Sequence, residues 1–315
     1  ADGRQIYSRP PMGNYNEDSL RGFYYSHDSI KLTRFCMPEG TIEQTEVENV
    51  PFTQYSKSAV FTFLEMVVSF AYGSHGVTMN LFDHAGTPME TESVYGKMLA
   101  SKKAWLNALA EMAQVKGVYR GVRLLHHERA SYSKQMWEGA DYYNLSEDGY
   151  ELMQALESHG IPTTYEESSI TATTGQVLRA FSDSELTKML AGSLFVDAVA
   201  ARILYERGFG RMIGVETMEK PVNIDSFGAF SAEEFFNEKF GGKEKSFLTL
   251  TIPHLGGRPS LSVMKPMKNA EIISSVVDPD ARRIYPCMIA YENETGGRVV
   301  VHAIDWASAY GVAFN

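Results

Sequence analysis

The sequence predicts an α/β protein that ends in an antiparallel β region. Short apolar strands alternate with helical segments over residues 1–125, and the same alternation returns over residues 126–218. From residue 219 to residue 315 the apolar residues change to a period of two, which is typical of two-faced strands. We therefore expect three domains with these bounds, in agreement with a chain of 315 residues.

The first domain is expected to be parallel. Its predicted elements are a helix over 17–35, a strand over 41–48, a helix over 58–72, a strand over 76–82 and a helix over 94–114. Strands that alternate with helices through short connections form a parallel sheet or a (β/α) barrel. A complete eightfold barrel takes on the order of 250 residues, so these elements predict the last units of a barrel.

The second domain is expected to be a small doubly wound sheet. Ser182 and Glu185 have the spacing of a capping box, and Asp197 follows a short strand where a helix should begin. In the third domain, period-two runs separated by Gly, Pro and Asn turns predict an antiparallel β-sandwich. These runs are residues 247–252, 261–264, 271–277, 284–291 and 298–304.

Composition excludes several classes of protein. A net charge of -10 without a Lys or Arg cluster argues against nucleic acid as a partner. No apolar run reaches the ~20 residues of a membrane helix, and Cys36 and Cys287 stand alone, which excludes a disulfide scaffold. The adjacent side chains in His126-His127-Glu128 point apart, and Gly208 to Gly214 follow a helix, so we expect no metal and no cofactor. The compartment stays open, cytoplasmic or secreted and periplasmic.

Two glutamates mark the end of the first predicted strand. In the stretch TEVENVPFTQYSKS, Glu46 and Glu48 are two residues apart and therefore point to the same face of a strand. Active sites of parallel barrels lie at the carboxyl ends of the strands, where a fixed carboxylate can attack the anomeric carbon of a sugar. The alternative is an exposed acidic strand end.

A resemblance favours the catalytic alternative. The run SHDSIKLTRFCMPEGTIEQTEVENVPFTQYSKS, followed by a helix and then AYGSHGVTMNLFDHAGTP, resembles the last barrel units of the β-galactosidases of glycoside hydrolase family forty-two. The resemblance covers roughly residues 20–115 and places Glu48, before Asn49 and Pro51, at the nucleophile. It also implies an amidotransferase-like α/β domain that makes oligomer contacts, followed by a small β domain.

The resemblance also implies a sugar pocket. Its residues would be Glu46, Asn49, Tyr55, Phe82 and Asp83, although the family usually has Trp and then Arg where this chain has Phe82 and Asp83. A retaining enzyme needs a second carboxyl about 5–5.5 Å from the nucleophile, and the resemblance places it on an earlier strand that would precede residue 1. The pairs Asn16-Glu17, Asn237-Glu238 and Asn293-Glu294 do not fit that role.

The sequence thus predicts the C-terminal portion of a retaining, β-galactosidase-like glycoside hydrolase. It would act on O-glycosidic bonds of a carbohydrate through a covalent glycosyl-enzyme, as a homo-oligomer without cofactors. The chain alone would be inactive because the acid/base carboxyl is elsewhere. One alternative is a non-catalytic carbohydrate-binding or oligomerisation module. Another is an α/β binding protein in which two chains pair to complete the sheet.

Overall fold

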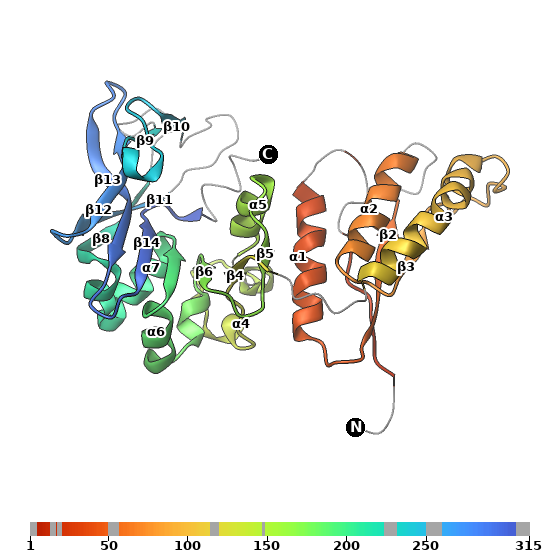
Figure 1. The fold of residues 1–315 in the computed structure, drawn as a ribbon, viewed down its shortest axis with the longest axis horizontal. Helices are drawn as coiled ribbons and strands as arrows, with labels where there is room; N and C mark the ends of the chain where they lie inside the picture. Colours follow the sequence, from red (N-terminus) through yellow and green to blue (C-terminus); the bar gives the residue numbers. More distant parts are fainter. Residues whose placement is uncertain are drawn as a thin grey trace. The chain divides into compact units, whose positions relative to one another are not determined.

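The computed structural model describes residues 5–12, 17, 21–49, 57–113, 120–146, 149–223, 232–249 and 260–306. The chain divides into two compact units, Ala1–Tyr119 and Arg120–Asn315, which we call the N-terminal and C-terminal units (Figure 1). Within the ranges described, no helix has the length and apolar character that crossing a lipid bilayer requires.

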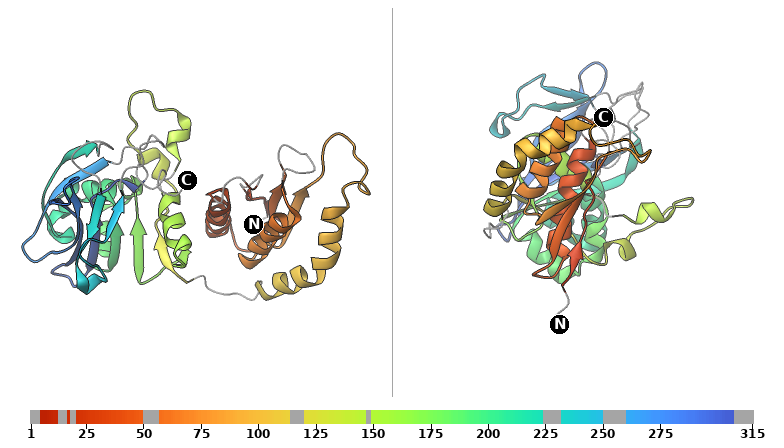
Figure 2. Two further views of the ribbon diagram at one scale, coloured as in Figure 1. Left: turned by 90° about the horizontal axis from the view of Figure 1, so that it is seen from above. Right: turned by 90° about the vertical axis from the view of Figure 1, so that its right-hand side faces the viewer.

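The N-terminal unit contains a parallel sheet of three strands in the order β1-β2-β3. Figure 2 shows this sheet and its helices, in red to yellow, from two further sides. A helix follows each strand in the sequence, and the strand and helix pattern predicts all of these elements except β1. The elements are β1 (Tyr7–Ser8), α1 (Arg21–Cys36), β2 (Ile42–Glu48), α2 (Ala59–Ala71), β3 (Gly76–Asn80) and α3 (Ser93–Ala113).

Local sequence signals determine where α2 begins and ends. The hydroxyl of Ser58 accepts a hydrogen bond from the backbone N–H of Phe61, which satisfies a free donor of the first turn. Gly73 follows the helix with a φ of +83°, a conformation that a side chain disfavours. The predicted helix and the turn after it are thus confirmed.

The two faces of β2 have different surroundings. Val47 is fully buried with Ile30 of α1, Met66 of α2 and Leu106 of α3, so helices cover this face of the strand. The alternate residues Gln44, Glu46 and Glu48 lie on the opposite face and are half-buried. This strand therefore has one face buried under the helices and a half-buried polar face on the other side.

Glu43 is the charged residue of β2 on the helix-covered face. Burial raises the pKa of its carboxyl from 4.5 to about 7, and Arg34 of α1 offsets only part of this effect. Between these two values the folded state keeps a proton that the unfolded state has lost. The stability contribution of Glu43 is therefore lost progressively as the pH rises through that window.

We expect Glu43→Gln to gain stability relative to the wild type as the pH rises from about 5 to about 8, because the amide stays neutral. Urea unfolding of both proteins at several pH values measures the difference. A difference that does not change over this pH range would contradict the expectation.

The C-terminal unit is built on one mixed sheet of nine strands, in the order β10-β9-β12-β13-β14-β7-β6-β4-β5. Five neighbours from β5 to β14 are parallel, and the other strands pair antiparallel. In chain order the parallel strands run second, first, third, fourth and fifth, which is a doubly wound order. The order of the parallel strands is therefore that of the predicted doubly wound arrangement.

The elements of this unit alternate helices and strands before β8 and are mostly strands after it. Before β8 they are β4 (Val122–Leu124), α4 (Ala130–Ser133), η1 (Tyr142–Leu145), α5 (Tyr150–Ser158), β5 (Thr163–Thr164), β6 (Ile170–Thr173), η2 (Val177–Ala180), α6 (Asp183–Leu190), β7 (Ser193–Val196), α7 (Ala198–Leu204), η3 (Tyr205–Phe209) and η4 (Gly210–Ile213). From β8 onward they are β8 (Val215–Asn223), β9 (Ala232–Phe235), η5 (Glu238–Phe240), β10 (Phe247–Thr249), β11 (Ser260–Pro266), β12 (Glu271–Val277), β13 (Arg283–Glu292) and β14 (Arg298–His302).

The strands after residue 219 differ from the expected separate sandwich. β14 pairs in parallel with β7, with Val299 opposite Leu194 and Val301 opposite Val196. The antiparallel strands thereby extend the doubly wound sheet, and β8 and β11 form a separate two-stranded ribbon. A period of two in the sequence shows that a strand has two faces, but it does not show which strand lies beside it.

Asp197 ties together the carboxyl ends of three neighbouring strands. Its fully buried carboxylate accepts hydrogen bonds from the backbone N–H groups of Gly175 after β6, Ala200 in α7 and Trp306 after β14. Burial raises the pKa of this carboxyl to about 7, against the effect of those donors. The predicted capping role of Asp197 is confirmed, and so is the capping box of Ser182 and Glu185.

Candidate active site

Glu48 is the last residue of β2. Its half-buried carboxylate accepts a hydrogen bond from Nδ2 of Asn80, at 3.3 Å from Oε1. Asn80 is its register partner on β3, and Nε2 of His84 lies 3.1 Å from the Oδ1 of Asn80. A carboxylate nucleophile needs a fixed orientation, and this hydrogen bond helps to supply it. Glu48 thus lies at the strand end expected for it, with a defined orientation.

Glu46 shares the face of Glu48, as the spacing of two residues predicts. Its Oε1 lies 2.9 Å from a guanidinium nitrogen of Arg9, and its side chain is 16% exposed. The two carboxylates therefore have different partners, a cation for Glu46 and a neutral amide for Glu48. Within the described residues, the Glu48 carboxylate is thus bound by an amide and the Glu46 carboxylate by a cation.

The other predicted pocket residues occupy varied surroundings. Asn49 is buried, and its Nδ2 donates to the carbonyl oxygen of Leu81 at 3.1 Å, so it joins the ends of β2 and β3. Phe82 packs edge-on against Tyr95, with 6.0 Å between the ring centroids. Tyr55 lies outside the residues that the structure describes. Contacts of these residues with a substrate stay predictions.

Asp83 begins a tight turn after β3. Its Oδ1 accepts hydrogen bonds from the backbone N–H groups of Ala85, at 2.9 Å, and of Thr87, at 3.3 Å. Hydrogen bonds from the side chain and backbone of Thr87, together with that from Ala85, hold the pKa of Asp83 below its usual value. Asp83 therefore has a structural role in ordering the loop, and its predicted role in substrate binding is untested.

A cavity of about 400 Å³ opens among the loops that follow β1, β2 and β3. It is lined by Glu17 from the first loop, by Lys57, Ser58 and Ala59 at the start of α2, and by Thr91, Glu92, Val94 and Tyr95 around the start of α3. All three loops follow the carboxyl ends of parallel strands, which is where ligands bind in such sheets.

Glu92 is a residue of this cavity that sequence reasoning missed. The residue is 6% exposed, and neither carboxylate oxygen makes a hydrogen bond of regular geometry within the described residues, although the carboxyl interacts with that of Asp83. An unsatisfied buried carboxylate is costly, so such groups are common where a ligand supplies the missing partner. No sequence pattern around METES, residues 89–93, distinguishes Glu92 from the neighbouring Glu90, which is exposed.

Lys57 and Glu65 form a second feature that the sequence analysis did not include. Nζ of Lys57 lies 2.7 Å from Oε2 of Glu65, and both side chains are fully buried. A signal for this pair does exist, because Glu65 is the one charged residue in the apolar helix AVFTFLEMVVSFA. A buried charge of this kind predicts a buried partner.

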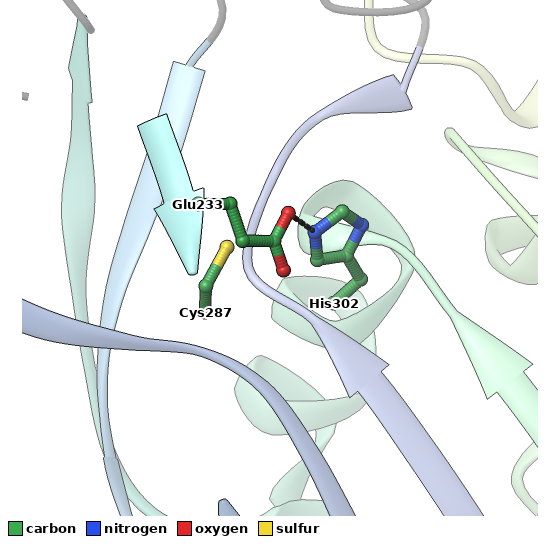
Figure 3. A group of neighbouring side chains, drawn as sticks. All are labelled: Glu233, Cys287 and His302. Carbon is green, nitrogen blue, oxygen red and sulfur yellow. Dashed lines mark hydrogen bonds and ion pairs between the residues drawn. The ribbon is translucent and has the colours of Figure 1, made fainter. Parts of the chain in front are cut away.

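The C-terminal unit has a buried cluster of Glu233, Cys287 and His302 (Figure 3). Their possible ligand atoms lie within 4.8 Å of one another, and no other such group occurs within the described part of the chain. Burial and the neighbouring Glu233 raise the pKa of the Cys287 thiol well above its usual value. Cys287 is therefore neither an accessible nor an activated nucleophile.

The hydrogen bonds of this cluster determine which ring nitrogen of His302 carries the proton. The indole N–H of Trp306, which can only donate, lies 2.6 Å from Nδ1 of His302. Nδ1 must therefore accept, and the ring proton lies on Nε2, 3.1 Å from Oε2 of Glu233. Ser274 donates to the other oxygen of Glu233.

This arrangement does not fit a metal site. A metal would need the lone pair of Nε2, and a histidine that binds metal through Nε2 normally donates its other N–H to an acceptor. Trp306 instead presents a donor to Nδ1. Burial by itself raises the pKa of Glu233, but His302, Ser274 and Cys287 outweigh burial and lower it below its usual value. The cluster is a satisfied hydrogen-bond network.

We expect stoichiometric zinc to leave the unfolding midpoint of the chain unchanged, because Trp306 keeps the proton on Nε2 of His302. Trp306→Phe removes this donor and should allow some stabilisation by zinc. Thermal unfolding with and without zinc measures both proteins, and His302→Gln controls for binding elsewhere. Zinc stabilisation of the wild type that His302→Gln abolishes would contradict the assignment.

Known proteins are similar to this chain in structure and not in sequence. No known protein family matches this sequence, and no curated protein sequence matches it. The fold is similar to that of alpha-L-fucosidase isoenzyme 2 from Paenibacillus thiaminolyticus, with a TM-score of 0.56 and 13% identity over 95% of this chain. The chain spans 45% of the length of that fucosidase. At this identity the likeness shows only that the fold is similar to part of that enzyme.

Proposed function

We propose that this chain is the C-terminal part of a retaining glycoside hydrolase in which Glu48 is the nucleophile. The observation that carries the proposal is the position of Glu48 at the carboxyl end of β2, the edge of the parallel sheet where the loops form the cavity. Glu92 lines this cavity, and Glu48 is not among its described lining residues. The likeness in fold to a glycoside hydrolase supports it. The substrate is then a carbohydrate, and the reaction is cleavage of an O-glycosidic bond.

The chemistry requires two carboxyl groups. An oxygen of Glu48 bonds to the anomeric carbon while the glycosidic oxygen leaves and takes a proton from an acid, and water then releases the sugar. Glu17 lines the cavity, but its Oε1 is occupied by the backbone N–H and hydroxyl of Ser58 at the start of α2. We therefore assign the acid to a residue outside the chain, as the resemblance implies.

The resemblance and the similar solved structure indicate different sugars. The resemblance of residues 20–115 favours a β-galactoside, whereas the similar solved structure is named as an α-L-fucosidase. Both sugars belong in the test. A homo-oligomer is part of the same proposal and stays a prediction.

We expect a 2-deoxy-2-fluoro galactoside or fucoside with a good leaving group to esterify Glu48 in a form of the protein that includes the acid. Glu48→Gln should lower turnover by on the order of a thousandfold, and Glu46→Gln is the matched control on the same face. Peptide mass spectrometry locates the ester. The absence of an ester with either sugar would favour the non-catalytic binding module.

In the form of the protein that includes the acid, we expect Glu92→Gln to lower kcat/KM by about ten- to a hundredfold. This is the effect of losing a hydrogen bond to a charged group. Glu90→Gln, two residues away and exposed, is the control. Values of kcat/KM for aryl glycosides measure the effect. Equal values for Glu92→Gln and the wild type would remove Glu92 from the sugar site.

A further inference from the structure

Lys57 is a buried lysine in direct contact with the residue that carries the proposed nucleophile. Its Nζ lies 2.6 Å from the backbone carbonyl oxygen of Glu48 and 2.7 Å from Oε2 of Glu65 in α2. The residue is 3% exposed, and it also lines the cavity. One ammonium group thus connects the end of β2 to the helix that follows it.

Neighbouring contacts hold Lys57 in place from other elements. The hydroxyl of Tyr95 in α3 donates to the carbonyl oxygen of Lys57 at 2.6 Å. The next residue, Ser58, caps α2 and donates through its backbone N–H to Glu17, 3.0 Å away in the loop after β1. Segments after all three strands therefore meet around Lys57.

The buried pair is a poor source of stability. Burial raises the pKa of Glu65 to about 7 and lowers that of Lys57, since both charges have lost water. Oε1 of Glu65 is also buried without a hydrogen-bond partner. Ion pairs of this kind can often be replaced by apolar residues of similar volume without loss of stability. The pair therefore calls for an explanation other than folding.

We propose that Lys57, held by Glu65, is a positioning residue that fixes the end of β2 and the orientation of Glu48. The ammonium group donates hydrogen bonds to the Glu48 carbonyl and to Glu65 of α2, so the end of β2 is held to the helix that follows it. The effect on chemistry rests on the proposed function of Glu48, whereas the fixing of the strand end does not.

The test separates position from folding with a double variant. Lys57→Met alone leaves Glu65 buried without its cation and should be less stable than the wild type. Lys57→Met with Glu65→Leu removes both charges at similar volume and should recover most of that stability. Lys31→Met, at a buried lysine of α1, is the matched control.

The first measurement needs no enzyme activity. The backbone N–H of Asn49, next to Glu48, donates to the carbonyl oxygen of Asn80 at 3.0 Å. If Lys57 fixes this strand end, amide hydrogen exchange at Asn49 should be about tenfold faster in the double variant at equal global stability. Unchanged exchange would overturn the proposal, whatever the function of Glu48.

The second measurement follows esterification of Glu48 at increasing fluorosugar concentration, in the form of the protein that includes the acid. The double variant should react at least tenfold more slowly at saturation while its binding constant for the fluorosugar stays close to that of the wild type, because the nucleophile is displaced. Lys31→Met should keep both wild-type values.

The two proposals fail in different ways. If the wild type is never esterified at Glu48, the proposed function fails while the exchange measurement still decides the role of Lys57. If the wild type and the double variant react at equal rates at saturating fluorosugar, Glu48 remains the nucleophile and the positioning role of Lys57 is overturned.

Discussion

The parallel register between β2 and β3 is the constraint on which the candidate site depends. It places Glu48 opposite Asn80 and brings the loops after both strands to one edge of the sheet. An antiparallel pairing would put these loops at opposite edges, and no cavity could combine them. The helices on the Val47 face supply the burial that keeps this register in place.

The polar groups of this edge are arranged in two layers. Glu48 and Asn80 are half-buried, so a ligand can reach them. Lys57 and Glu65 are buried, and they bind each other and the backbone of Glu48. Such an arrangement keeps a reacting group rigid, because its supports cannot exchange their partners for water. The buried carboxylate oxygens of Glu92, which make no regular hydrogen bond within the described residues, lie at the same edge. A purely structural edge would not be expected to contain such a group.

In the C-terminal unit, by contrast, the buried carboxylates of Asp197 and Glu233 have hydrogen-bond partners within the protein. Asp197 is satisfied by three backbone donors, and Glu233 by His302 and Ser274. Satisfied networks of this kind add specificity to a fold without offering a site for a ligand. The chemistry proposed for this chain is therefore confined to the N-terminal unit, and the likeness to part of a glycoside hydrolase extends over both.

The sequence by itself determined the helices of the N-terminal unit, the strands β2 and β3 and the shared face of Glu46 and Glu48, because these depend on local caps and on side-chain period. It did not indicate β1, which the tertiary structure adds beside β2. It also determined the capping roles of Ser182 and Asp197. Only the tertiary structure decided that β14 joins β7, that Asn49 is buried and that Lys57 meets Glu65. Those outcomes depend on which segments become neighbours in space, and a one-dimensional pattern carries no information about that choice.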